Sequence, residues 1–422
     1  MKIRSLLLGS VAALGFSAGA FATDLGVETD FDICGDLGLS GLMISSDNNC
    51  LVITGEVKYE YNWGDYLVGA PPGAVKLPIW GLFDFDNSTY GVNAADGTND
   101  SASLLDWWLQ FTATGSSSFG PTKATIKLED SSNMTNGVKV SQAFVSIGDT
   151  TMLIAGMTDS IFNNKDDEPL NFLGLFNSDL IDKGVGAHST DGFSGGRVMI
   201  ETGGHVIQVV HDLGNGLSIA GGLENLNNLV GDFTGVGVLA YKSDTISAHI
   251  SVAADHNEPS PSPFDDWVVH SGFTGTFDTV KVVGAAAVNS DGFWNVLGSA
   301  SVGWDMITLA VSGEATNFER GFGASIAAAV TDGVSISVGG RVFQDGGGQL
   351  AQVAGQIVAS VTDEVKLTGE VGAISSTFAP TVGYAKGMVE WAPGGGFTAS
   401  IAGEVNNYGA YKATFKAAKK ID

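Results

Sequence analysis

Short runs in which apolar and polar residues alternate recur along this chain, and they constrain its fold more than any other feature. In the run 51–62, LVITGEVKYEYN, the odd-numbered positions are apolar or glycine, and from position 54 the even-numbered positions are polar. Comparable runs occupy 122–129, 306–316, 364–373 and 396–406. Successive side chains of a β-strand point to opposite faces, so each run predicts a strand with one apolar face. Each run has about ten residues, the length that a tilted strand needs to cross a bilayer.

The connections between the runs are of two kinds. One kind is a tight turn with hairpin-forming residues such as Gly, Asn and Asp. It occurs at 214–216, 243–244, 278–279, 305–306, 331–333, 362–364 and 394–396. The other kind is longer or more variable and occurs at 63–103, 158–193, 225–234, 255–266, 344–349 and 375–381. Short turns on one side and longer loops on the other are typical of outer-membrane barrels.

We therefore predict an all-β fold, an antiparallel transmembrane β-barrel with one long loop folded into its lumen. The strand count is about 20, within a range of roughly 16–20, and its even parity brings both ends of the barrel to one side. A soluble β-sandwich also alternates, with its polar face outward, and this alternative stays open on alternation alone.

The first residues, MKIRSLLLGSVAALGFSAGAFA, combine a basic start, a short apolar core and a small-residue cleavage pattern. They predict a secretory signal peptide over 1–22. A transmembrane helix is the alternative, but the apolar core is short, and no run of about twenty apolar residues follows it. The sequence thus predicts an exported protein without a spanning helix.

Cys34 and Cys50 are the two cysteines of the chain. Export places them in an oxidising compartment, where a disulfide persists. A metal site is the rival interpretation, but no further ligands lie nearby in a recognisable spacing. We predict a disulfide that tethers the segment 23–50 just before the first strand, with the barrel over 51–416 and a C-terminal tail over 417–422.

The composition excludes two further classes of protein. A formal net charge of -26 argues against binding nucleic acid or anionic lipid by bulk attraction. A hydrophobic content of 44% is too high for a disordered chain.

The polar faces of the predicted strands carry many charged residues. If the apolar faces meet lipid, these residues line the lumen, because unpaired charges in a packed core cost too much free energy. A barrel of many strands is wide enough to hold water. The predicted lining includes Lys58, Lys123, Lys127, Lys281, Arg341, Lys366, Lys412, Glu56, Glu60, Glu129, Glu314, Glu370 and Glu404.

Three stretches carry a family resemblance. The region from Cys34 through CLVITGEVKYEYNW, the stretch QAFVSIGDTTMLIAGMTDSIFN (142–163) and LGNGLSIAGGLEN (213–225) resemble the alphaproteobacterial porin family. The resemblance implies a trimeric outer-membrane channel that passes small hydrophilic solutes by diffusion. Two features depart from the family: its members usually have sixteen strands, and Phe415 is followed by seven further residues, either as a free basic tail or as part of an unusual insertion signal.

The same resemblance implies that the loop 158–193 folds inward and narrows the pore. Its apolar residues, between Leu170 and Phe176, would then pack against the wall. The acidic side of the constriction would comprise Asp159, Asp166, Asp167, Glu168, Asp179 and Asp182. The basic side would comprise Arg197, Arg341, Lys58, Lys123, Lys127 and Lys366. For any one of these residues, a solvated wall charge without a special role is the alternative.

The sequence therefore predicts a porin that passes small hydrophilic solutes and ions, with a mild preference for cations from its acidic surplus. The expected partners are outer-membrane lipid, lipopolysaccharide and two further copies of the chain. A secreted or surface-attached adhesin is the alternative function. No enzyme, cofactor or metal is expected, because the six histidines lie in no nucleophile or zinc motif and residues 166–168 lack the spacing of a calcium loop.

Overall fold

The computed structural model describes residue 34 and residues 42–45, 49–66, 97–130, 137–162, 169–176, 200–227, 232–256, 266–344, 347–377 and 379–421. The predicted signal peptide lies outside the described residues. No helix among those described is long and apolar enough to cross a membrane.

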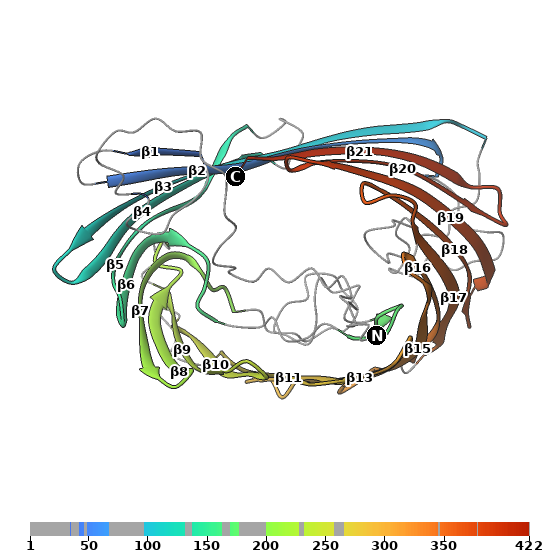
Figure 1. The fold of residues 1–422 in the computed structure, drawn as a ribbon. Coiled ribbons are helices and arrows are strands. Elements are labelled where there is room, and N and C mark those ends of the chain that lie inside the picture. The colour runs from blue at the N-terminus through green and yellow to red at the C-terminus, as the bar shows by residue number, and fades with distance from the viewer. Residues whose placement is uncertain are drawn as a thin grey trace, which may run out of the picture.

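The described chain forms 21 strands in one sheet (Figure 1). They are β1 (Leu42–Ser45), β2 (Asn49–Asp65), β3 (Asp100–Ser117), β4 (Gly120–Asp130), β5 (Lys139–Gly148), β6 (Thr151–Thr158), β7 (Gly204–Gly214), β8 (Leu217–Glu224), β9 (Phe233–Lys242), β10 (Ile246–His256), β11 (Trp267–Phe277), β12 (Val280–Asn289), β13 (Trp294–Trp304), β14 (Ile307–Thr316), β15 (Arg320–Thr331), β16 (Val334–Gln344), β17 (Gln349–Ser360), β18 (Val365–Ser376), β19 (Ala379–Gly394), β20 (Phe397–Asn406) and β21 (Tyr411–Ile421).

Strands β2 to β21 close into a 20-stranded antiparallel barrel. Each strand pairs with the next in sequence, and β21 pairs back with β2, where Lys416 lies opposite Glu60. Figure 1 shows the strands arranged as a ring. The predictions of an all-β antiparallel barrel and of about twenty strands are confirmed. Because the number is even, the start of β2 and the end of β21 lie at the same end of the barrel, beside the short turns.

The short turns use the residues that the sequence indicated. Asn215, Asp278 and Asp305 adopt positive φ angles of 53°, 51° and 56°, which Asn and Asp tolerate better than most residues. Gly216, at φ 80°, lies so close to the Lys242 carbonyl that a side chain would collide with it. These tight turns fix the register of the hairpins.

The outward face of the barrel is an apolar band with aromatic residues near both of its edges. Large apolar side chains such as Val353, Val371 and Ile401 are 55%, 63% and 64% exposed. Exposed aromatics beside the short turns are Tyr241, Phe277, Trp304 and Trp391. Exposed aromatics near the opposite end of the strands are Trp63, Trp267, Trp294 and Phe322. A soluble sandwich would bury its apolar faces between two sheets, whereas a membrane barrel presents this pattern to lipid.

The C-terminal boundary predicted at 416/417 is wrong. Residues 417–421 continue β21, with Ile421 opposite Gly55 of β2 and Lys419 opposite Phe397 of β20. The strand extends past Phe415 because both neighbouring strands offer backbone partners there. The basic residues at this end therefore belong to the barrel wall.

The predicted Cys34–Cys50 disulfide is present, with both cysteines buried. Cys50 lies on the part of β2 that extends beyond the end of β21. Here β2 pairs with β1 in place of β21, and Leu42 lies opposite Ile53. The disulfide thus joins Cys34 to the part of β2 that pairs with β1.

We expect reduction of this disulfide, or a Cys34→Ser/Cys50→Ser variant, to lower the temperature at which the folded band disappears in a gel-shift assay. The chain-entropy model gives a loss of about 3 kcal/mol for a loop of this size. The barrel itself should persist, because the strand pairings that close it lie outside the bridged loop, except those of Asn49 and Cys50 with β3. An unchanged transition on adding dithiothreitol to the parent, with free thiols verified, would contradict this role.

Candidate functional site

The connection between β6 and β7 enters the lumen. Parity along the strands identifies the inner face: on β13, Trp294 and Val296 are exposed on the outside, whereas Leu297 and Ser299 are buried. The described segment 169–176 packs on this inner face and is drawn inside the ring in Figure 1. The prediction that a long loop folds inward is confirmed for its described part.

Apolar contacts hold the segment against the wall. Leu173 and Phe176 join a buried cluster with Phe343, Leu350, Ala354, Ile374, Val382 and Tyr384 of β16–β19. Leu175 joins a second cluster with Val283, Ala285 and Leu297 of β12 and β13. Leu175 and Phe176 have no exposed surface. The apolar residues of this acidic loop therefore attach it to the barrel wall.

Two wall serines fix the backbone of the same segment. The amide of Leu170 donates to Ser299 Oγ at 2.8 Å, and the amide of Phe172 donates to Ser325 Oγ at 2.9 Å. These bonds satisfy two backbone donors that lie on the wall.

A buried carboxylate clamps the base of the loop. Glu224 of β8 is fully buried and accepts from the amides of Ile161 at 3.0 Å and Gly203 at 2.6 Å, one from each arm of the loop. Gln208 of β7 donates to the same carboxylate at 2.9 Å and to the Asp159 carbonyl at 3.1 Å. Sequence reasoning missed Glu224, because nothing in its local pattern separates it from the other polar residues of the lumen face.

Arg341 lies beneath the loop. Its guanidinium stands 4.4 Å from the centre of the Phe176 ring, and its Nε donates to Gln352 Oε1 at 2.8 Å. Gln352 donates to the Tyr384 hydroxyl, which donates to Glu370. Arg341 is 3% exposed, so it supports the loop from below and does not face open lumen.

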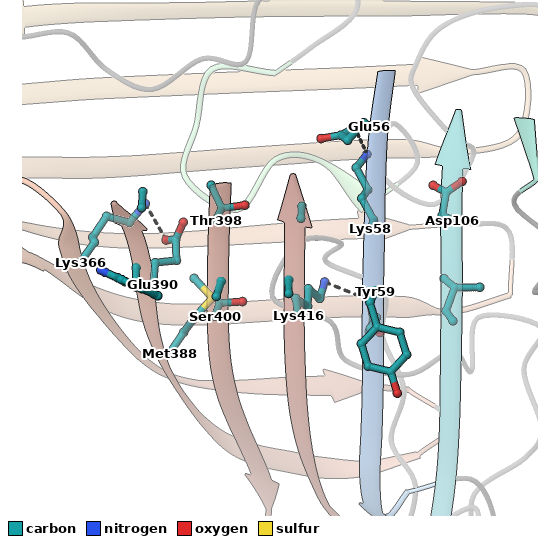
Figure 2. A pocket seen from close by; sticks show the side chains of 17 residues that line it. Glu56, Lys58, Tyr59, Asp106, Lys366, Met388, Glu390, Thr398, Ser400 and Lys416 are labelled. Carbon is teal, nitrogen blue, oxygen red and sulfur yellow. Dashed lines mark ion pairs between the residues drawn. The ribbon is translucent and has the colours of Figure 1, made fainter. Parts of the chain in front are cut away.

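A further part of the lumen surface is lined by charge. We call the inner face of β18–β21 and β2–β4 the charged wall. It carries the ion pairs Lys58–Glu56 at 2.9 Å, Lys127–Glu129 at 2.9 Å, Lys366–Glu390 at 2.8 Å, Lys412–Glu404 at 3.6 Å and Lys416–Glu60 at 3.3 Å. A hollow of about 560 Å³ lies on this wall (Figure 2).

The strand register sorts these charges into rows. One row runs across five neighbouring strands as Lys366, Glu390, Ser400, Lys416 and Glu60. A second row runs as Glu370, Lys386, Glu404 and Lys412. The charges alternate in sign along both rows, with the neutral Ser400 between Glu390 and Lys416 in the first, so each charge stands beside a compensating neighbour. The wall is polar without a large net charge of its own.

The predicted constriction residues divide into four groups. Lys58, Lys123, Lys127 and Lys366 lie on the charged wall, and Asp159 lies at the start of the inward loop, where it accepts from Gln142 at 2.9 Å. Arg341 is enclosed under the loop. Asp166, Asp167, Glu168, Asp179, Asp182 and Arg197 lie outside the described residues. Within the described part of the chain, no group of three or more His, Cys, Asp or Glu could hold a metal ion.

Comparisons with known proteins give similar folds but no related sequence. No family model matches the chain, and no curated protein matches it. Similar solved structures include an anion-selective porin from Comamonas acidovorans, with 12% identity and a TM-score of 0.41, covering 88% of this chain and 99% of that one. A triple mutant of Rhodopseudomonas blastica porin has 11% identity and a TM-score of 0.38, covering 88% and 99%. The outer-membrane channel DcaP of Acinetobacter baumannii has 10% identity and a TM-score of 0.35, covering 90% and 100%.

Proposed function

We propose that this chain forms a water-filled channel in the outer membrane, through which small hydrophilic solutes and ions diffuse passively. One observation carries the proposal: a closed 20-stranded barrel presents large apolar side chains outward and solvated charges inward. The side chains of Lys58, Lys366 and Glu390 are 53%, 44% and 40% exposed on the inside of the ring. Charged side chains with this exposure are in contact with water, because a dry interior would bury them.

The experiment that tests this proposal is conductance in a planar bilayer. We expect the purified mature protein to add discrete current steps in potassium chloride and to need detergent for solubility. Migration that shifts on boiling in a gel should accompany these steps. A monodisperse, non-conducting protein in detergent-free buffer would overturn the channel and favour the adhesin alternative.

We also propose a mild preference for cations, supported by the net charge of -26 and by the carboxylates of the inward loop. Neutralising Asp166, Asp167 and Glu168 to the corresponding amides is expected to move the reversal potential in asymmetric salt toward zero. The matched control neutralises Asp278, Asp305 and Asp332, which lie at short turns, and should leave that potential in place. Equal shifts in both triple variants would contradict the proposal that the loop carboxylates lie at the constriction.

The proposal also includes a trimeric assembly and membership of the alphaproteobacterial porin family. The three stretches that resemble alphaproteobacterial porins support a homotrimer embedded in outer-membrane lipid and lipopolysaccharide. The mass of the detergent-extracted complex tests the trimer, and a monomeric mass would overturn it while leaving the channel intact.

A further inference from the structure

One row of the charged wall contains a neutral position, which we call the gap. Across β18, β19, β20, β21 and β2 the residues are positive, negative, neutral, positive and negative, and the neutral position is Ser400. The second row has no such gap, because its four positions on β18–β21 are all charged. Figure 2 shows Ser400 between Glu390 and Lys416.

The two charged residues on either side of Ser400 have opposite sign, and hydroxyl groups line the hollow between them. Glu390 lies on one side of Ser400 and Lys416 on the other, and Thr398 is the next residue of β20 on the same face. All four side chains line the hollow of about 560 Å³. A site with a carboxylate at one end and an ammonium at the other is complementary to a solute that carries both charges.

From this arrangement we propose that the hollow on the charged wall binds small zwitterions of dipeptide length. The ammonium group of the solute pairs with Glu390, its carboxylate pairs with Lys416, and Ser400 and Thr398 donate to the carboxylate. The inference rests on the proposed channel function and names the solute class that the channel selects.

The length of the solute follows from the strand spacing. Glu390 and Lys416 lie two strands apart, which places their backbones about 9.5 Å from each other. Their charged groups are separated further, because Glu390 pairs with Lys366 and Lys416 pairs with Glu60, and both partners lie on the side away from Ser400. Two extended residues span about 7 Å, and a charged hydrogen bond at each end adds about 2.8 Å. A dipeptide therefore bridges the gap, whereas a single amino acid is too short to reach both ends.

The existing ion pairs do not prevent this binding. An ammonium group has three donors and a carboxylate has about four acceptor sites, so each can hold its wall partner and the solute together. Met388 lies two residues before Glu390, on the same face of β19. It lines the hollow and offers apolar contact to the body of the solute.

The test measures how glycylglycine reduces the ion current of single channels in a planar bilayer. The parent is expected to show a concentration-dependent reduction, with glycine weaker and the neutral N-acetylated, amidated dipeptide without effect. In a Glu390→Gln/Lys416→Gln variant, which conserves net charge, the half-reducing concentration of glycylglycine should rise about tenfold. The control variant Lys242→Gln/Asp244→Asn makes the same charge change at an exposed turn and should behave as the parent.

The outcomes separate this inference from the channel itself. Equal reduction by the dipeptide and its neutral analogue, or no change in the double variant, would overturn the site while the current steps uphold the channel. Glycine acting as strongly as glycylglycine would overturn the dipeptide length. Absence of any current step in the parent would overturn the channel and the site together. If the double variant does not fold, Ser400→Lys places a cation in the gap and should weaken the reduction to a similar extent.

Discussion

A Phe176→Ala variant is expected to conduct about twice the current of the parent in each single-channel step, because a loop that leaves the wall widens the water path. Phe176 is fully buried between the loop and the wall, in a cluster with Phe343 and Leu350, and it covers Arg341. Removing a buried phenylalanine side chain costs about 3–5 kcal/mol. That loss falls on the contact between loop and wall, whereas the strand pairings that close the barrel stay intact.

Two variants sharpen this prediction. Phe322→Ala makes the same chemical change on the outward face, where the ring is 54% exposed, and should leave the step size unchanged. Glu224→Gln weakens the clamp at the base of the loop, since a neutral amide oxygen accepts hydrogen bonds from Ile161 and Gly203 less strongly than a carboxylate does. It should increase the fluctuation of the current between levels. A Phe176→Ala step equal to that of the parent, in protein that still shifts on boiling, would show that the loop does not limit the current.

Replacing Val353 with arginine is expected to prevent most of the protein from inserting as a folded barrel. Val353 lies near the middle of β17 on the outward face and is 55% exposed. An arginine on the lipid-facing side at the bilayer midplane costs about 2–4 kcal/mol. Folding into lipid vesicles, followed by the gel shift on boiling, measures the inserted fraction.

The matched control lies three residues further along the same strand. Gln356 faces the lumen, where its amide donates to Glu370 at 3.2 Å. A Gln356→Arg variant carries the same new charge beside a carboxylate and water, and it should insert as well as the parent. Equal insertion of both variants would contradict the assignment of the apolar face to lipid.

Several features of this protein follow from local sequence. A period of two is visible within a single strand, so 51–62 and the runs like it predict strands, and their length and turns predict a barrel. The close spacing of Cys34 and Cys50 predicts their pairing. The apolar residues around Phe176, read together with the family resemblance, predict an inward loop, since they gain little from an exposed position.

Other features depend on which strands become neighbours. Glu224 clamps the loop because β8 lies beside β7, and Arg341 is covered because the loop crosses to β16. The row around Ser400 joins residues from 60 to 416, and the end of β21 is ordered by a pairing with β2 across nearly the whole chain. The alternation by itself determined that this chain forms strands with one apolar and one charged face. The tertiary structure alone decided which charges stand side by side, because strand register is set by pairing between distant segments and a shift of one residue would exchange the two faces.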